Sequence, residues 1–549
     1  MGIDSAVERL AEFALDLTEW WPLAGGAVSL VDRDGTLATF GFGMSDAEHE
    51  EPASPHDVWL IGSISKTFVS LVVNQLVDEG VMALDEPITS VLPWVDLGAG
   101  EPEVELWQLL SHTGGLIMGA DGLPDDLAQA WDLRNLARLA RPIEHFHYSN
   151  VGYMLLGQAV EARTGDLLAN EVRRRIFEPL GMTNSFGRTR QSMRGTMATG
   201  YWPAREDSPW APGDPIIPAY WFDIDAAEGN VASSAADMAQ FARLLLGDGV
   251  VDGVRVMSSD AMSRVTTATA PQGEDIVGLR DGFECADSRY GLGVNVEVID
   301  GRTCLTHGGG MVGYQAFLLS DRDAGIGVQV LTNANGCYPV AQVIARAAHQ
   351  LLVEPDRALP PARDAVRIEH APALSYLVGS FTSDGPGGFT VEVSGDEPVE
   401  LSLSFGGLSA NLTRIWDGRY VTDHPALRSF RWDPADSGWI NGPHVLTREA
   451  PAQPTLPKPE HVPLIGRYRS YSPWYPTLRI VERSGELFLI TAGGVEAPEF
   501  DCLLVPVGPG TWRIGADEWL PERIVAGPEV DGEVIMVLRD GHAYTRLVD

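Results

Sequence analysis

Apolar and polar residues alternate along the first 350 positions with two different periods. Apolar residues at helical spacing predict helices, and strict alternation or short apolar runs between turn residues predict strands. The pattern predicts helices over Glu8–Trp21, Ser63–Asp78 and Pro339–Leu352, a hairpin over Gly26–Gly43 that turns at Asp34-Gly35, and antiparallel strands over 290–299, 302–306 and 314–332. This order of elements predicts an α+β domain over residues 1–355.

The pattern changes after a proline-rich stretch, Glu354–Pro372. From there, short alternating runs separated by Gly, Asp and Pro indicate an all-β region. A second proline-rich stretch, Pro451–Pro463, divides this region into modules over 373–450 and 463–549. We expect two small β-barrels or sandwiches, the second lipocalin-like, with their aromatic residues in the barrel cores (Trp474, Tyr475, Trp512, Trp519).

The two modules also share short sequences at their ends. Leu377-Val378-Gly379-Ser380-Phe381 opens the first, and Leu464-Ile465-Gly466-Arg467-Tyr468 opens the second. Each closes with Gly, His and then Thr-Arg, at Thr447-Arg448 and Thr545-Arg546. These matches indicate an internal duplication.

Charge and cysteine content narrow the function classes. With 39 basic and 76 acidic residues the formal net charge is −37, which disfavours nucleic-acid and anionic-membrane partners. The first residues do not show the basic segment, apolar segment and small-residue cleavage site that are typical of a signal peptide. No uncharged apolar run is long enough to span a bilayer. The scattered cysteines (Cys285, Cys304, Cys337, Cys502) fit reduced thiols, so we expect a cytoplasmic protein.

The candidate chemistry begins at Ile61-Gly62-Ser63-Ile64-Ser65-Lys66. Positions i and i+3 of a helix share a face, so Lys66 can take the proton of the Ser63 hydroxyl. Free lysine has a pKa of about 10.4, so a lysine base needs burial to lower that pKa. The chain has only two lysines, Lys66 and Lys458, among its 39 basic residues. Arginine cannot accept a proton, so lysine at position 66 favours a catalytic interpretation over a solvated helix face.

Two further segments add polar groups suited to acyl transfer. In Tyr148-Ser149-Asn150, a phenol can relay a proton and an amide can hold both the lysine and a substrate carbonyl. In His307-Gly308-Gly309-Gly310, glycines let the backbone approach a ligand, and an N–H of this segment can form an oxyanion hole with that of Ser63. His307 can orient or charge-balance the site. Each segment alone is as well explained by an ordinary loop.

Together and in this order, the three segments resemble the serine β-lactamase and penicillin-binding-protein superfamily, in particular its class C-like D-aminopeptidases and esterases. The resemblance extends over residues 1–350, through LWQLLSHTGGL, YGLGVNVEV and HGGGMVGYQAFLLSDRDAGIGVQVLTN. It implies a β-lactamase-like catalytic domain with a helical subdomain. It also implies the site roles: Ser63 as nucleophile, Lys66 as base, Tyr148 as proton shuttle, Asn150 and His307 as supporting catalytic residues, and Gly310 as an oxyanion donor.

The chain departs from the superfamily pattern in two places. His307 stands where penicillin-recognising enzymes carry lysine, which counts against an efficient β-lactamase. Glu228-Gly229-Asn230 stands where relatives have Ala-Gly-Gly, and Glu228 there either binds a substrate ammonium or faces solvent. Glu228, Asn230 and Gly309 are therefore candidate substrate-binding residues.

These observations predict a serine acyl-enzyme hydrolase of amides, short D-residue peptides or esters. The alternatives are an acyltransferase or peptide cyclase that uses an ester or thioester, and a non-catalytic binding protein. We expect a small-molecule or peptide substrate, no cofactor and no metal; a homodimer stays open. His112, His145 and His147 are expected to be structural, since no metal-binding motif accompanies them.

Overall fold

The computed structural model describes residues 3–97, 103–119, 130–131, 133–136, 142–221, 223–336, 338–385, 388–436, 438–449, 456–493, 495 and 501–548. Cys337 and residues 451–455 of the second proline-rich stretch lie outside these ranges. The described chain forms two compact units. The first comprises residues up to Trp202 and from Ile216 to Arg363, and the second comprises Pro203–Pro215 and the chain from Asp364 onward.

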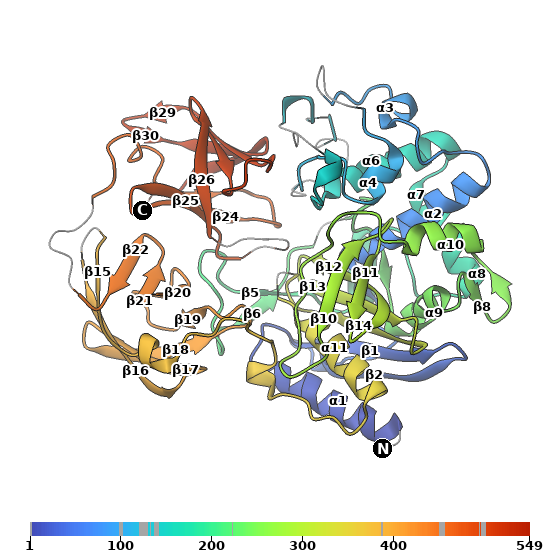
Figure 1. The fold of residues 1–549 in the computed structure, drawn as a ribbon, viewed down its shortest axis with the longest axis horizontal. Helices are drawn as coiled ribbons and strands as arrows, with labels where there is room; N and C mark the ends of the chain where they lie inside the picture. The colour runs from blue at the N-terminus through green and yellow to red at the C-terminus, as the bar shows by residue number, and fades with distance from the viewer. Residues whose placement is uncertain are drawn as a thin grey trace. The chain divides into compact units, whose positions relative to one another are not determined.

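An eight-stranded antiparallel sheet is the centre of the first unit (Figure 1). Its strand order is β10-β11-β12-β13-β14-β1-β2-β3. The strands are β10 (Cys285–Tyr290), β11 (Asn295–Ile299), β12 (Arg302–Met311), β13 (Tyr314–Asp321), β14 (Ile326–Thr332), β1 (Gly25–Asp32), β2 (Thr36–Asp46) and β3 (Glu51–Pro52). The predicted hairpin is confirmed as β1–β2, and 314–332 holds the β13–β14 hairpin. Strands β1 and β14 are far apart in the sequence but pair with each other, with Val28 opposite Val330, and so join β1–β3 to β10–β14.

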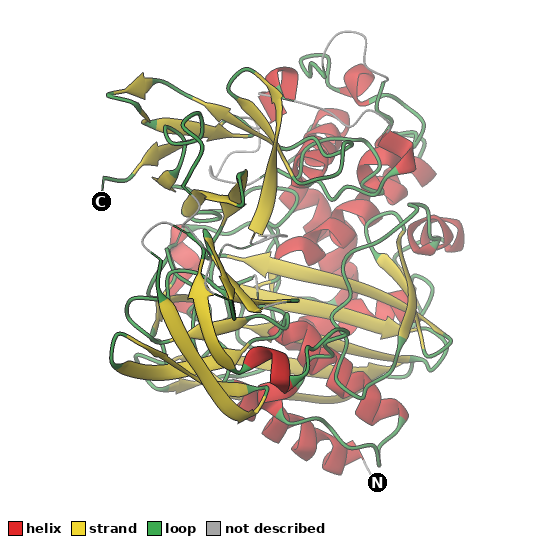
Figure 2. Cartoon of the chain, turned by 60° about the vertical axis from the view of Figure 1, so that its left-hand side comes forward, coloured by secondary structure: helices red, strands yellow, loops and turns green. Residues whose placement is uncertain are grey.

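Helices cover both faces of this sheet. Strands β1 and β14 are therefore buried along nearly their whole length. Helix α9 (Ala235–Leu246) packs Ala239, Ala242 and Leu246 against Val31 of β1. Helices α1 (Ile3–Leu17) and α11 (Val340–Val353) pack against each other and against the sheet. Figure 2 shows the long central strands with helices above and below them. The predicted helices are confirmed, although α1 begins and ends several residues earlier than its pattern indicated.

The first unit also contains a helical region beside the sheet. Helix α2 (Ser65–Asp78) is buried over most of its length and packs against α6 (Asn150–Thr164) and α10 (Ser259–Thr266). Helix α6 also packs against the short α4 (Leu106–Leu110). The α+β class with a helical subdomain is therefore confirmed. None of the helices in the described ranges is long and apolar enough to cross a membrane.

The C-terminal region folds into two closed eight-stranded barrels, as predicted. The first contains β15 (Gly379–Ser383), β16 (Thr390–Glu397), β17 (Glu400–Phe405), β18 (Leu408–Arg414), β19 (Tyr420–Thr422), β20 (Trp432–Ala435), β21 (Gly438–Asn441) and β22 (His444–Thr447). The second contains β23 (Gly466–Arg469), β24 (Thr477–Arg483), β25 (Glu486–Ile490), β26 (Asp501–Gly508), β27 (Thr511–Ile514), β28 (Arg523–Ala526), β31 (Met536–Arg539) and β32 (His542–Arg546). Trp474 and Tyr475 are buried, whereas Trp512 and Trp519 are half-buried.

Both barrels close in the same way, by pairing the first strand with the last. In the first barrel, Arg448 donates a hydrogen bond to the carbonyl of Val378 at 2.8 Å. In the second, Arg546 donates to the carbonyl of Ile465 at 2.7 Å. Each guanidinium also lies where a side chain would project from the glycine that follows, Gly379 or Gly466. The shared Gly and Thr-Arg sequences therefore form the same closure twice, which supports the duplication.

Candidate active site

The nucleophile candidate lies on a tight turn that leads into α2. Gly62–Ile64 forms a single 3-10 turn, η1, and α2 begins at Ser65, so Ser63 and Lys66 stay on one face. Gly62 has a φ of +53°, which glycine adopts at little cost. Ser63 is 5% exposed and Lys66 is fully buried. Both side chains are therefore largely shielded from water, Lys66 completely.

Lys66 lies among hydrogen-bond acceptors from three different segments of the chain. Its Nζ lies 2.9 Å from Ser63 Oγ, 2.7 Å from Asn150 Oδ1 and 3.0 Å from the main-chain oxygen of Glu228. When the amine is neutral, it can still donate to Asn150 and Glu228. The tetrahedral geometry of nitrogen then directs its lone pair toward Ser63 Oγ. The arrangement suits an amine that accepts the serine proton.

Tyr148 faces Lys66 and is supported from behind by His112. The centre of the Tyr148 ring lies 4.8 Å from Lys66 Nζ. The imidazole of His112 stacks on the Tyr148 ring, with 4.3 Å between ring centres, and its Nδ1 accepts a hydrogen bond from the Ser149 N–H at 3.0 Å. Burial, followed by the nearby Lys66, lowers the pKa of His112 well below its usual value. His112, expected to be structural, therefore positions Tyr148 as a neutral ring.

The Tyr148–Asn150 segment is fixed at the start of α6. Ser149 Oγ accepts the Gly152 N–H at 3.1 Å, which caps the helix, and donates to the Ile117 carbonyl at 2.7 Å. The Asn150 N–H donates to the Met118 carbonyl at 2.7 Å. These bonds hold the amide oxygen of Asn150 against Lys66 and leave little freedom to the shuttle candidate beside it.

His307 lies within the sheet interior and is fully buried. Its Nδ1 donates to the Gly308 carbonyl at 2.6 Å, so its Nε2 accepts the hydroxyl hydrogen of Tyr290 at 2.7 Å. The pKa of His307 is lowered to about 3, chiefly by burial; the Gly308 bond opposes this shift, and the nearby Lys66 contributes to it. A neutral imidazole cannot balance charge. Of the two roles left open by the sequence, the geometry favours orienting the backbone at Gly308.

The glycines after His307 continue strand β12 instead of forming a turn. Strand β11 pairs with β12 only as far as Thr306, whereas β13 pairs with β12 up to Met311. The edge that β11 leaves faces η1, which packs against β12. A Cβ on Gly309 would lie 1.9 Å from the Ile61 oxygen, and one on Gly62 would lie 2.7 Å from the Gly310 nitrogen. Only glycine permits this approach, which brings the backbone of Gly310 close to that of Ser63.

Glu228 and Asn230 are both buried, at 5% and 1% exposure, and the main-chain oxygen of Glu228 accepts a hydrogen bond from Lys66. The segment is held by a main-chain bond from Ile61 to Val231 at 3.1 Å and by the Val231 N–H, which donates to Ser65 Oγ at 3.0 Å. Glu228 therefore does not face solvent, one of the two alternatives left by the sequence. The structure places Glu228, Ser63, Lys66, Tyr148 and Asn150 around one point.

Tyr290 and Tyr153 are supporting residues that the sequence did not indicate. Tyr290 donates to His307, and Tyr153 Oη donates to the Leu110 carbonyl at 2.7 Å. Burial raises the pKa of both phenols above their usual value, so both stay neutral donors. Tyr290 lies in the YGLG sequence, where the strand pattern was evident but a hydroxyl partner 17 residues away was not.

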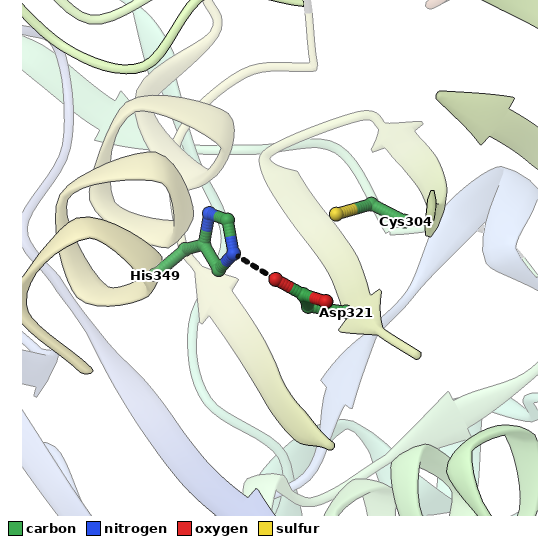
Figure 3. Close-up of side chains that lie close together, drawn as sticks. All are labelled: Cys304, Asp321 and His349. Carbon is green, nitrogen blue, oxygen red and sulfur yellow. Dashed lines mark hydrogen bonds and ion pairs between the residues drawn. The ribbon is translucent and has the colours of Figure 1, made fainter. Parts of the chain in front are cut away.

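A separate group of polar residues lies between the sheet and α11 (Figure 3). Cys304 and Asp321 are paired across β12 and β13, and His349 of α11 approaches Asp321 with Nε2 2.8 Å from Oδ2. Burial opposes ionisation of Asp321, but bonds from His349 and Ala324 outweigh it and lower the pKa of that carboxyl. Cys304, Asp321 and His349 are close enough together to be candidate metal ligands within the described ranges, whereas His145 and His147 belong to no such group. The His349–Asp321 bond links α11 to β13, in addition to the buried face that the helix packs on the sheet.

Comparison with known proteins agrees with this architecture. The chain is 29% identical over 317 residues to penicillin-binding protein 4 of Amycolatopsis lactamdurans, covering 56% of this chain and 80% of that protein. It is 26% identical over 401 residues to a D-aminopeptidase of Gluconobacter oxydans, covering 70% of each. It is 36% identical over 178 residues to esterase EstB of Burkholderia gladioli, covering 29% of this chain and 45% of the esterase.

A solved structure extends the likeness beyond the catalytic unit. The octameric penicillin-binding protein homologue from Pyrococcus abyssi matches with a TM-score of 0.58 at 22% identity, covering 89% of this chain and 98% of that one. At that identity the match speaks for the fold. The Beta-lactamase family model matches residues 21–352, well over half of the sequence. The chain therefore belongs to the Beta-lactamase family.

Proposed function

We propose that this protein is a serine acyl hydrolase in which Ser63 is the nucleophile and Lys66 its general base. The observation that carries the proposal is the 2.9 Å contact between Lys66 Nζ and Ser63 Oγ, with Asn150 and the Glu228 carbonyl fixing the amine. A hydroxyl is a weak nucleophile until a base takes its proton, and a buried amine in this position can do so.

In the proposed reaction, Ser63 Oγ attacks the carbonyl carbon of an amide or ester while its proton passes to neutral Lys66. The N–H groups of Ser63 and Gly310 donate to the carbonyl oxygen as it becomes negative. The proton then moves through Tyr148 to the leaving amine or alcohol, and the C–N or C–O bond breaks. Water attacks the acyl-enzyme by the reverse proton route, releasing the carboxylic acid and restoring Ser63.

We further propose amides and short peptides with a D residue as the substrate class, with esters as a second class. The likeness to a D-aminopeptidase over 70% of both chains supports the first class, and the likeness to an esterase supports the second. A β-lactam carboxylate is a poor fit, because the pKa of His307 near 3 leaves no cation at that position.

The test is a panel of D- and L-aminoacyl p-nitroanilides, p-nitrophenyl esters and N-acetylcysteamine thioesters, run with wild type and Ser63→Ala. Ser90→Ala, an exposed serine on the same unit, is the control. Hydrolysis abolished by Ser63→Ala alone, with a fluorophosphonate adduct on wild type, supports the proposal. Products that carry an added amine in excess over water products would show a transferase, and the absence of both adduct and turnover would indicate a binding protein.

A further inference from the structure

We infer that Cys304, Asp321 and His349 bind a divalent transition-metal ion, zinc by the chemistry of the ligands, outside the catalytic site. The three residues belong to β12, β13 and α11, so the ion joins two strands of the sheet to the helix that covers them. Figure 3 shows the sulfur, the carboxylate and the imidazole turned toward one another. Because the three positions are far apart in the sequence, no short metal-binding motif indicates them.

The three donor atoms have a spacing that a metal ion can bridge. Cys304 Sγ, a carboxylate oxygen of Asp321 and a ring nitrogen of His349 all lie within 4.8 Å of one another. Zinc bonds of about 2.0–2.3 Å at tetrahedral angles place donor atoms roughly 3.3–3.6 Å apart. His349 Nε2 and Asp321 Oδ2, at 2.8 Å, then separate by about 0.5 Å, and the sulfur approaches by about 1 Å at most. Small side-chain rotations are enough for shifts of this size.

The types of ligand favour zinc over calcium or magnesium. Thiolate and imidazole are preferred by zinc and similar transition metals, whereas calcium and magnesium take oxygen ligands. Cys304 and Asp321 are 0% exposed and His349 is 1% exposed, so the group lies away from water. The hydrogen bond between His349 and Asp321 does not involve Cys304. That bond alone therefore does not explain the thiol, whereas a metal ion uses all three side chains.

The charges around the group balance those of a bound ion. On binding, the Cys304 thiol loses its proton to solvent, and neutral His349 binds through Nε2 with its hydrogen on Nδ1. The thiolate and the Asp321 carboxylate then neutralise the two positive charges of the ion. Glu297, opposite Cys304 on β11, is already paired with Arg346, with 2.6 Å between the oxygen and the guanidinium nitrogen. The buried layer thus carries no net charge, which avoids the cost of an uncompensated buried ion.

The test uses Co²⁺, which occupies zinc sites and gives a thiolate-to-cobalt absorption band when a cysteine binds it. The full chain, without a histidine tag, is expressed in minimal medium with Co²⁺ in place of Zn²⁺, because a buried site is best filled as the protein folds. Wild type should retain about one Co²⁺ per chain after dialysis and show the band. Added Zn²⁺ should displace the Co²⁺ and raise the temperature of unfolding, since an ion that binds only the folded state stabilises it.

Matched variants show which side chains hold the ion. Cys304→Ser should remove the band, and His349→Gln should lower the retained Co²⁺ more than about tenfold, since even residues behind the ligands are worth 10–100-fold in affinity. Cys285→Ser changes another cysteine of the same sheet and should keep both the band and the Co²⁺.

The inference is independent of the proposed function, so Ser63→Ala should also keep the band and the Co²⁺. Wild type without bound Co²⁺ or without the band would overturn the inference. A band that survives Cys304→Ser, or that Cys285→Ser removes, would overturn it as well. Because the band is measured on wild type first, a variant that fails to fold does not remove the test.

Discussion

Gly62→Ala tests whether the close approach of η1 to β12 creates the oxyanion site. A Cβ at residue 62 would lie 2.6 Å from the oxygen and 2.7 Å from the nitrogen of Gly310. Both neighbours are backbone atoms, so no side chain can rotate away. Ordinary contacts begin at 3.4 Å, so the two segments must separate by about 0.8 Å. The N–H groups of Ser63 and Gly310 then no longer point at one position.

The expected loss follows from the geometry of oxyanion donors. Such donors act at about 2.7–3.1 Å, and removing one of them costs roughly 10²–10³-fold in kcat. A displacement near 1 Å has an effect of about 10²-fold by itself. We therefore expect kcat for a p-nitrophenyl ester to fall about 100-fold. The left-handed φ of +53° adds strain of about 1–2 kcal/mol, which lowers stability but leaves the chemistry of the folded enzyme unchanged.

Gly80→Ala is the matched control for the strain. Gly80 has a φ of +70° at the end of α2, and a Cβ there meets nothing within 4 Å. Both variants should lose similar stability, measured by thermal unfolding, whereas only Gly62→Ala should lose turnover. Kinetics are normalised to the fraction of folded protein, measured by circular dichroism. If Gly62→Ala turned over esters as fast as Gly80→Ala, the contact between η1 and β12 would not form the oxyanion site.

Three further predictions concern the groups around Lys66. Lys66→Arg keeps the positive charge but removes the proton acceptor, so kcat/KM should fall about 10²–10⁴-fold; near-normal turnover would exclude Lys66 as the base. Tyr290→Phe leaves Nε2 of His307 without its donor, so we expect about 1 kcal/mol less stability and a lower kcat with little change in KM; a rise in KM alone would contradict an orienting role. The buried His112 and His307 have lowered pKa values, so the unfolded state binds more protons below pH 6.5. The free energy of unfolding should therefore fall as pH drops from 6.5, by about 1.4 kcal/mol per pH unit for each histidine. Urea unfolding at pH 7 and at pH 5 should show that His307→Gln loses less stability between these two pH values than wild type does.

The sequence was sufficient for most of the predicted elements because their signals are local; the strand predicted over 290–299 was wrong in its bounds, since β10 ends at Tyr290 and β11 begins at Asn295. The Asp34-Gly35 turn, the apolar face of α2 and the alternation in the late strands each lie within a dozen residues. Even the barrel closure left a local trace in the Gly and Thr-Arg sequences. The extension of β12 through Gly308–Gly310 left none, because glycine runs are typical of turns. That segment stays extended because β13 pairs with it up to Met311, a long-range effect.

The site residues also fall into those that local sequence signals predict and those that depend on long-range contacts. Ser63 and Lys66 are one turn apart, so their contact follows from helical geometry, and Tyr148 and Asn150 were indicated by their chemistry together with the family resemblance. The environment of His307 depends on Tyr290 from another strand, and the stacking of His112 on Tyr148 depends on a loop 36 residues away. Sequence patterns carry no information on which buried hydroxyl or ring will face an imidazole. Burial decides the direction in which the pKa of a histidine shifts, and tertiary packing decides which polar residues are buried.

The rarity of lysine in this chain has a structural counterpart at Lys66. The fully buried side chain lies within hydrogen-bond distance of Ser63 Oγ, Asn150 Oδ1 and the Glu228 carbonyl. A neutral amine can donate to two of these acceptors and accept the proton of the third, whereas a planar guanidinium has no acceptor. The composition therefore favours arginine where charge alone matters, on exposed positions and in ion pairs. At the buried position 66, lysine also supplies tetrahedral geometry and the ability to lose a proton, whereas the other lysine, Lys458, is exposed.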